Sequence, residues 1–313
     1  QTYNMDLRTK ACDTARVLLP AATLTNVGVF GNGRYFQNLL THLYTLGVDE
    51  MDNIARKAHT ALNRVIPQYV RRAKKNDYIA ENERRMQNLT DKLLESVAPE
   101  EESHVVLLDN PTRESQFIDY MFAAMLYKYS KHPMKQLRRF VTSLPDERKE
   151  EIMNTYVGNR SSRRDRPGRA LEFGYPLTFD LVGDFGIYRD LERHRMLTQE
   201  RQRLSTDLGF SMSDSIVEAG FKDQVEEAAE RASNLYHRLR RDFPYESQYA
   251  ILLGFNMRWT MGMNAREAGH MLELRTGPQG HPNYRRVWQE MHRQVVARHP
   301  KLATVLGFVD HTD

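Results

Sequence analysis

The chain has 313 residues, of which 40% are hydrophobic and 27% charged, the balance of a soluble globular protein. It is long for one compact unit, so we expect two domains or a duplicated one. The 45 Lys and Arg residues against 41 Asp and Glu give a net charge of +4, which is too weak to argue for nucleic acid as a partner.

The single cysteine, Cys12, excludes an internal disulfide and a cysteine-based zinc site, and it fits a reducing cytoplasm. No apolar run approaches the length needed to cross a bilayer, and the opening QTYNMDLRTK is not a secretory signal. We therefore expect a cytoplasmic protein that uses neither a membrane nor a metal. Because the chain opens inside a helical pattern without Met, we also expect a fragment that lacks an upstream part.

Helical periodicity dominates the chain. Helices are expected over residues 6–17, 49–75 (with a break near Pro67), 82–97, 114–130, 189–205 and 223–243. The segments 104–109 and 170–183 have the composition of strands. The polar stretch APEEES at 98–103 is expected to be a linker, and residues 159–169 a basic loop.

The stretch RDLERHRMLTQERQRLS, residues 189–205, places Arg193, His194 and Arg195 side by side. On a helix, the apolar positions Ile187 and Leu191 would share a face with His194, so we expect an inward histidine between two outward arginines. A solvated basic face with a packed histidine is the plainer alternative.

The chain also contains an internal repeat. With an offset of 232 residues, ARVLLPAATLTNVGVFGNGRYFQNLLTHL aligns with QYAILLGFNMRWTMGMNAREAGHMLELR. Asn32 then meets Asn264, Arg34 meets Arg266, and each copy continues into a long helix. Chance similarity between two helical segments is the alternative.

Four blocks, in order, resemble the flavin-dependent thymidylate synthases (the ThyX family). They are ALEFGYPLTFDLVGDFGIYRDLERHR, LYHRLRRDFPYESQYAILLG, RWTMGMNAREAGHMLELR and GHPNYRRVWQEM. The resemblance implies an oligomeric α+β fold with helices around a small antiparallel sheet. It implies a complete copy within residues 104–313 and, in residues 1–97, the last part of an earlier copy.

The resemblance implies FAD as the cofactor, since arginines can hold its phosphates by charge-assisted hydrogen bonds. The residues at family FAD positions are Arg193, His194, Arg195, Asn264, Ala265, Arg266, His270, His281, Asn32, Arg34 and Asn38. Taken singly, Arg266 and His270 are also a possible i, i+4 surface pair, and His281 a loop residue.

Arg275 stands where the family has an arginine that approaches the pyrimidine and favours its N3-ionised form. By resemblance it is the catalytic candidate, although a helix-end charge before Gly277 is an alternative reading. Arg16 matches a nucleotide-binding arginine of the family, and Arg203 and Ser205 lie where the substrate serine is expected.

The sequence departs from the family pattern on the nucleotide side. Arg203 replaces the expected serine, Asp190 replaces a glutamine, and Gln248 or Tyr249 replaces the arginine that Arg16 matches in the first copy. The first copy has instead lost the pyrimidine arginine, at Leu43. The two copies are therefore expected to pool their residues into one composite site.

Two main hypotheses follow. The first is an enzyme that passes hydride from reduced FAD to a methylene-bearing uracil nucleotide (dUMP to dTMP) or a related pyrimidine nucleotide, with a folate carbon donor and NADPH. The second is a degenerate copy that supports a homo-oligomer and binds ligands without turnover. An RNA- or polyphosphate-binding role for residues 159–169 ranks lowest, because that loop lacks aromatic residues for stacking.

Overall fold

A computed structural model describes residues 2–108, 114–159, 168, 170, 177–263, 265–280, 282–298, 306 and 309–312. Its contacts divide the chain into two compact units. The first contains residues 1–23, 96–149 and 169–313, and the second contains residues 24–95 and 150–168. These units are defined by contacts rather than by sequence similarity, so the division into two copies stays a prediction.

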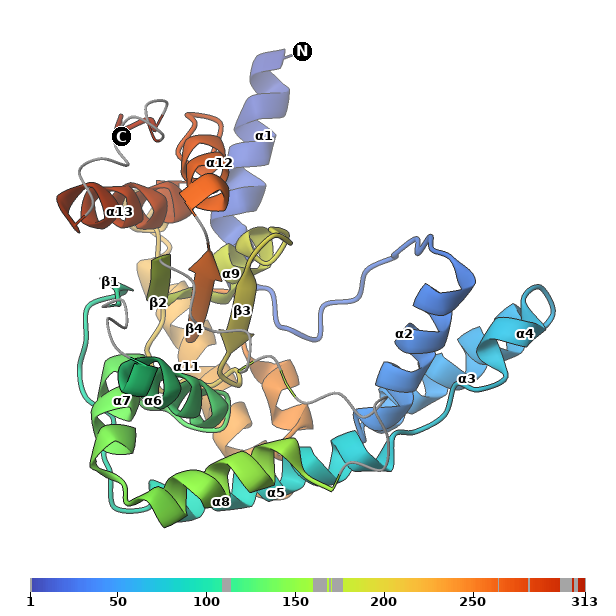
Figure 1. Cartoon of the computed structure of the whole chain (residues 1–313). Helices are drawn as coiled ribbons and strands as arrows, with labels where there is room; N and C mark the ends of the chain where they lie inside the picture. The colour runs from blue at the N-terminus through green and yellow to red at the C-terminus, as the bar shows by residue number, and fades with distance from the viewer. Residues whose placement is uncertain are drawn as a thin grey trace. The chain divides into compact units, whose positions relative to one another are not determined.

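The first unit contains an antiparallel sheet, in which the strands follow the order β1-β2-β4-β3 (Figure 1). Its members are β1 (Val105–Leu107), β2 (Leu177–Asp184), β3 (Thr198–Arg201) and β4 (Asn256–Met263). The long central strands β2 and β4 are buried at every residue and pair in a register that sets Leu181 opposite Trp259. The expected combination of helices with a small antiparallel sheet is confirmed.

Side chains of β2 and β4 alternate between the two faces of the sheet. Phe179, Leu181, Trp259 and Met261 lie on the face that forms the main hydrophobic core. The helices that contribute to this core are α9 (Phe185–Leu191), α11 (Lys222–Leu239), α12 (Ala265–Arg275) and α13 (Pro282–Arg298).

The opposite face of the sheet is polar although it is buried. Asp180 accepts hydrogen bonds from the Tyr127 hydroxyl (2.6 Å), the Met134 main-chain N–H (3.0 Å) and the Arg258 guanidinium (3.1 Å). Tyr127 ends α6 (Glu114–Tyr127) and Met134 begins α7 (Met134–Ser143), so these bonds hold both helices to the sheet.

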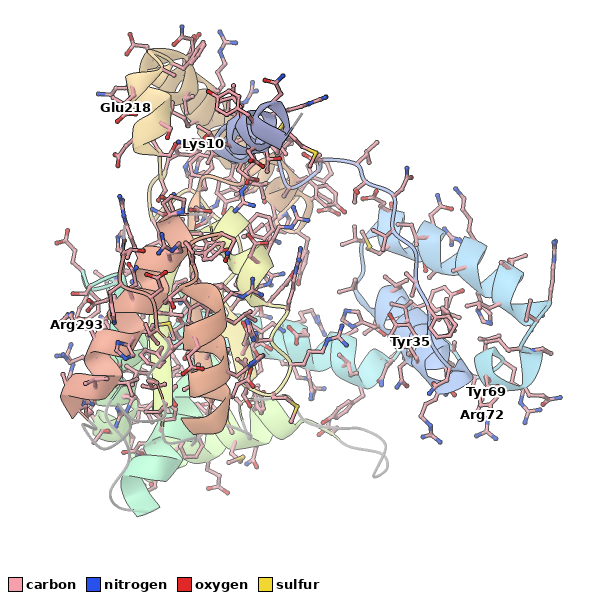
Figure 2. The ribbon with its side chains drawn as sticks, turned by 90° about the horizontal axis from the view of Figure 1, so that it is seen from above. Lys10, Tyr35, Tyr69, Arg72, Glu218 and Arg293 are labelled. Atoms are coloured by element: carbon pink, nitrogen blue, oxygen red, sulfur yellow. The ribbon has the colours of Figure 1, made fainter. Side chains whose placement is uncertain are left out.

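The second unit is helical and has its own small core. It contains α2 (Gly33–Thr45), α3 (Asp49–Asn63), α4 (Pro67–Val70), α5 (Asp77–Leu93) and most of α8 (Asp146–Val157). Leu40, Ala55 and Val70 are its buried centre. Figure 2 labels Tyr35 on α2, Tyr69 on α4 and Arg72 just after α4. The predicted break near Pro67 is confirmed, since α3 ends at Asn63 and Pro67 opens α4.

Further helical segments in the described part of the chain belong to the first unit. They are α1 (Thr2–Ala15), the 3-10 turns η1 (Arg16–Leu18) and η3 (Glu246–Ala250), and α10 (Asp214–Glu218). Within the described ranges, no helix combines the length and apolar character that crossing a membrane would require.

The expectation of one helix over residues 189–205 is wrong. Helix α9 ends at Leu191, a turn follows, and Thr198–Arg201 form β3. Pairing with β4, with Thr198 opposite Gly262 and Arg201 opposite Trp259, outweighs the helical pattern of these four residues.

Candidate functional site

His194 lies in the turn after α9 and points inward. The Asp184 carboxylate caps this helix by accepting from the Ile187 N–H at 2.8 Å, and the His194 N–H donates to the Leu191 carbonyl at 3.2 Å. His194 is only 8% exposed, while Arg193 and Arg195 on either side are exposed. The predicted orientation is confirmed, but a turn produces it rather than a helix face.

Two side chains of α12 hold the imidazole ring of His194. The Arg275 Nε–H donates to His194 Nε2 at 2.9 Å, and Glu267 Oε1 lies 3.3 Å from His194 Nδ1. Because Nε2 accepts, the neutral ring carries its proton on Nδ1, where the carboxylate can accept it. The His270 ring lies close by, with its centroid 6.0 Å from that of His194.

Burial and nearby positive charge keep His194 neutral. Burial, reinforced by the positive charge of Arg275 and by His270, lowers the pKa of His194 to about 4. At neutral pH the ring is therefore an acceptor at Nε2 and a donor at Nδ1.

Arg275 and Arg16 converge on Asp190. The Arg275 Nη2–H donates to the Asp190 main-chain carbonyl at 3.0 Å, and the Asp190 carboxylate pairs with Arg16 Nη2 at 3.2 Å. Arg193 lies 3.8 Å from the same carboxylate. Arg16 comes from η1 and Arg275 from α12, so residues 259 positions apart in the sequence meet at one acidic residue.

Asp184 adds a buried carboxyl to this cluster. Burial raises its pKa, while the Ile187 N–H and the charge of Arg16 act in the opposite direction. A Cβ added at Gly186 would lie 3.0 Å from the Asp184 carboxylate and 3.6 Å from the Arg16 guanidinium. The glycine thus leaves room for the Asp184 carboxylate that caps α9, while the contact with Arg16 would be an ordinary one.

Comparison with known proteins identifies the family. The chain matches the profile described as "Thymidylate synthase complementing protein" over residues 107–301. The chain belongs to this family. The resemblance to flavin-dependent thymidylate synthases is thereby confirmed at the level of the family.

Three relatives of the chain carry the name UPF0159 protein. It is 36% identical over 319 residues to one from Chlamydia muridarum (strain MoPn / Nigg), covering 99% of this chain and 60% of the relative. A protein of Chlamydia pneumoniae is 36% identical (99% and 59% covered), and Ta1429 of Thermoplasma acidophilum is 27% identical (100% and 62% covered). The chain spans about three fifths of the length of these relatives.

The arginines around His194 have the chemistry that a flavin pyrophosphate or a nucleotide phosphate needs. Arg193 is 72% exposed in its side chain and Arg195 is exposed, so both are open to solvent beside the buried histidine. The exposed guanidinium groups of Arg193 and Arg195 are therefore chemically suited to the phosphate groups of FAD.

Several predicted residues lie outside this cluster. Arg203 stacks over the Tyr245 ring at 4.6 Å, and the Ser205 hydroxyl accepts from the Asp207 N–H at 3.3 Å. Among the described contacts, none joins Arg203 or Ser205 to His194 or Arg275.

The three residues of the first copy that were predicted to bind FAD lie in the helical unit. Asn32 caps α2 by accepting from the Tyr35 N–H at 2.9 Å, and Arg34 and Asn38 are exposed on the same helix. Asn264 and His281 lie outside the described residues, as do the side chains of Ala265 and Arg266, whose main chain opens α12.

Asp184 and Glu267 belong to the cluster but were not predicted from the sequence. An Asp at the end of a buried strand is an N-cap signal that could have found Asp184. Glu267 and Arg275, eight residues apart, lie on one side of a helix, but nothing in the sequence indicates that His194 sits between them.

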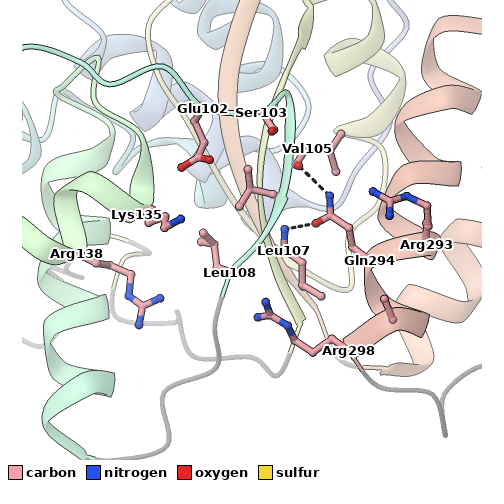
Figure 3. A pocket seen from close by; sticks show the side chains of 12 residues that line it. Glu102, Ser103, Val105, Leu107, Leu108, Lys135, Arg138, Arg293, Gln294 and Arg298 are labelled. Carbon is pink, nitrogen blue, oxygen red and sulfur yellow. Dashed lines mark hydrogen bonds between the residues drawn. The ribbon is translucent and has the colours of Figure 1, made fainter.

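A separate hollow of about 480 Å³ lies along the edge strand β1 (Figure 3). Gln294 of α13 closes the strand edge by accepting from the Leu107 N–H (2.6 Å) and donating to the Val105 carbonyl (2.9 Å). Lys135 and Arg138 of α7 and Arg293 and Arg298 of α13 line the hollow with positive charge, and Glu102 opposes them. No sequence pattern predicted that these cations would lie together.

Proposed function

We propose that this protein is a divergent flavin-dependent thymidylate synthase-type enzyme that binds FAD and a dUMP-like pyrimidine nucleotide. The observation that supports this most is the convergence of Arg16 and Arg275 on Asp190 beside a neutral His194. Arg16 matches a nucleotide-binding position and Arg275 a pyrimidine position, each kept in only one of the two predicted copies. Their meeting in one cluster is what a composite site requires.

Each part of the cluster has a task in this proposal. Arg193 and Arg195 would hold the FAD phosphates, with Arg266 and Asn264 beside them by resemblance. FAD, when bound, would supply the hydride that reduces a methylene group delivered by a folate donor, and NADPH would supply the electrons. Arg16 would bind the nucleotide phosphate, and Arg275 would stabilise the pyrimidine ionised at N3 by opposite charge.

Asp190 sets a condition on substrate binding. Its carboxylate forms an ion pair with the Arg16 guanidinium. A nucleotide phosphate would therefore have to compete with the Asp190 carboxylate for Arg16. Such competition lowers affinity for a phosphate. This supports a second candidate function, a catalytically degenerate family member that serves oligomerisation and binds flavin or nucleotide without turnover.

Flavin binding and turnover are tested in separate experiments. We would titrate FAD into the protein and into an Arg193→Ala/Arg195→Ala variant, which leaves the buried His194 and its partners in place. Arg241→Ala is the matched control, because that arginine is exposed and pairs only with its neighbour Asp242 among the contacts described for it. We expect the control to bind FAD like the wild type and the double variant to bind at least about a hundredfold more weakly.

Equal affinity of all three proteins for FAD would remove the assignment of Arg193 and Arg195. Turnover is then measured as dTMP formed from dUMP, a methylene-bearing folate and NADPH. FAD binding without dTMP formation would select the degenerate alternative.

A further inference from the structure

Two segments that are equivalent in the sequence repeat, residues 19–21 and 251–253, pair with each other through main-chain hydrogen bonds. Pro20 and Leu252 form an antiparallel bridge, flanked by bonds from the Ala21 N–H to the Ile251 carbonyl (2.7 Å) and from the Leu253 N–H to the Leu19 carbonyl (2.8 Å). Pro20 and Leu252 are 232 residues apart, the offset of the sequence repeat. At this offset residue 19 is equivalent to residue 251, and residue 21 to residue 253. The two hydrogen bonds are therefore equivalent to each other, as they would be across a twofold axis between two copies.

The elements on either side of the bridge also correspond at this offset. Turn η1 corresponds to the last part of η3, helix α2 to α12, and α3 to α13. Helix α2 packs on α3, and α12 likewise packs on α13. Leu40 of α2 and Leu272 of α12, equivalent at the same offset, are both completely buried.

Residues 24–31 are the exception to this correspondence. Their equivalents, residues 256–263, are the buried central strand β4. Residues 24–31 are instead in neither helix nor strand, and the structure gives their main chain no hydrogen bond to another described segment (Figure 1, the blue trace before α2). Leu24 is 90% exposed, Val27 73%, and Phe30 fully exposed.

The sequence of this segment is that of a strand. Thr25, Val27 and Val29 alternate along LTNVGVFG, and β-branched residues at every second position are typical of a strand with a buried face. At the offset of 232, Val27 and Val29 correspond to Trp259 and Met261, which lie in the main core of the first unit. A strand pattern with its apolar side chains in solvent indicates a missing partner.

The counterpart β4 indicates what this partner is. Strand β4 is bonded on one edge to β2 and on the other to β3, both antiparallel. We infer that residues 24–31 are the central strand of a second antiparallel sheet, and that the two flanking strands come from polypeptide outside residues 1–313. The longer relatives have such polypeptide, because this chain covers only 60% of the Chlamydia muridarum protein and 62% of the Thermoplasma acidophilum protein.

Hydrogen–deuterium exchange tests this inference directly. It would be followed in residues 1–313 and in the intact Chlamydia muridarum relative, on the peptides aligned with residues 24–31 and 256–263. We expect the first segment to exchange within seconds in residues 1–313 and at least about a hundredfold more slowly in the intact relative. The 256–263 peptide should be protected in both proteins.

Substitutions distinguish burial in a sheet from a surface effect. In residues 1–313, Val27→Asp/Val29→Asp should leave the melting temperature unchanged, as should Val65→Asp, a control at a residue that is 78% exposed. In the intact relative, the aligned double substitution should lower the melting temperature strongly, while the aligned control should not.

Two results would overturn the inference. One is fast exchange of the 24–31 peptide in the intact relative. The other is protection of residues 24–31 in the 1–313 chain that grows with protein concentration together with dimer formation, because a second copy would then be the partner.

Discussion

Arg275 donates a hydrogen bond from its guanidinium Nε to Nε2 of His194 at 2.9 Å. A cation can donate to this nitrogen only while the imidazole is unprotonated, so the two residues form a stable pair only when His194 is neutral. In the proposed function, His194 would lie on the flavin side of the site and Arg275 on the pyrimidine side. The bond would then make the protonation state of His194 depend on both sides of the site.

The first prediction concerns the pKa of His194 in the Arg275→Gln variant. Burial is the main cause of the low pKa of about 4 in the wild type, and the Arg275 charge is the second. Removing that charge should raise the pKa of His194 part of the way toward 6.5, because burial still disfavours the charged ring. The measurement is NMR titration of the imidazole C–H signals. Identical midpoints in the two proteins would mean that Arg275 does not act on His194 in solution.

The second prediction follows from the same pKa and concerns stability. The folded-state pKa of His194, about 4, lies below the unfolded value of 6.5, so the unfolded chain takes up the proton first. The stability contributed by neutral His194 is fully present above pH 6.5, decreases as the pH falls toward 4, and then levels off. The full decrease is about 3 kcal/mol, since one pKa unit corresponds to about 1.4 kcal/mol.

Urea unfolding at pH 7.5 and pH 4.5 measures this contribution in the wild type and in His194→Gln. Glutamine can accept and donate but does not titrate, so the variant should lose less stability than the wild type between the two pH values. Parallel losses in the two proteins would show that His194 does not titrate with folding.

The elements that could be predicted from the sequence are those in which local pattern and tertiary pairing agree. The strand at 104–109, the helix at 223–243 and the break near Pro67 are of this kind. The helix expected over 189–205 failed because Thr198–Arg201 pair with β4, a partner about 60 residues away that no local pattern reveals. The inward position of His194 was predicted from the apolar residues Ile187 and Leu191 before it.

The sequence could identify residues of the site by their type and motif position, but it could not identify their contacts. The resemblance singled out Arg16, His194 and Arg275, and the structure brings these three together through Asp190. In the sequence, Asp190 is only a departure from the family pattern on the nucleotide side, where it replaces a glutamine. The segment that follows Arg16 is bridged to Leu252 at Pro20, a pairing that the sequence suggests only through the repeat.

The third prediction separates the two partners of that ion pair. Asp190→Asn removes the internal anion that competes for Arg16, so it should raise affinity for dUMP about tenfold. Arg16→Gln removes the cation itself and should lower the affinity by at least as much. Calorimetric titration of dUMP measures both, with Asp242→Asn as the control because that carboxylate is exposed and pairs with Arg241. The prediction requires that the affinity for dUMP rises in Asp190→Asn and falls in Arg16→Gln. A lower affinity in both variants would mean that Asp190 has a purely structural role.

The fourth prediction concerns the buried ion pair on the polar face of the sheet. The side chains of Arg258 and Asp180 are 4% and 1% exposed, and the Tyr127 hydroxyl and the Met134 N–H complete the bonds to the carboxylate. Arg258→Met fills similar space but leaves Asp180 buried without a cation, which should cost about 3 to 5 kcal/mol at pH 8.

This loss should depend on pH in a defined direction. Burial already raises the pKa of Asp180, and Arg258 is the largest influence that lowers it, so the variant should have a still higher pKa at this carboxyl. A protonated Asp180 needs no cation, and the stability gap between wild type and Arg258→Met should therefore narrow as the pH falls from 8 to 5.

The double variant Arg258→Met/Asp180→Asn supplies the control for this prediction. It removes both charges and keeps an oxygen acceptor for Tyr127, so it should recover part of the lost stability at pH 8 and show no narrowing toward pH 5. Urea unfolding at pH 8 and pH 5 measures the free energy of unfolding of the three proteins. If the double variant is as unstable as Arg258→Met at pH 8, lost packing of the arginine, rather than an unpaired carboxylate, causes the destabilisation.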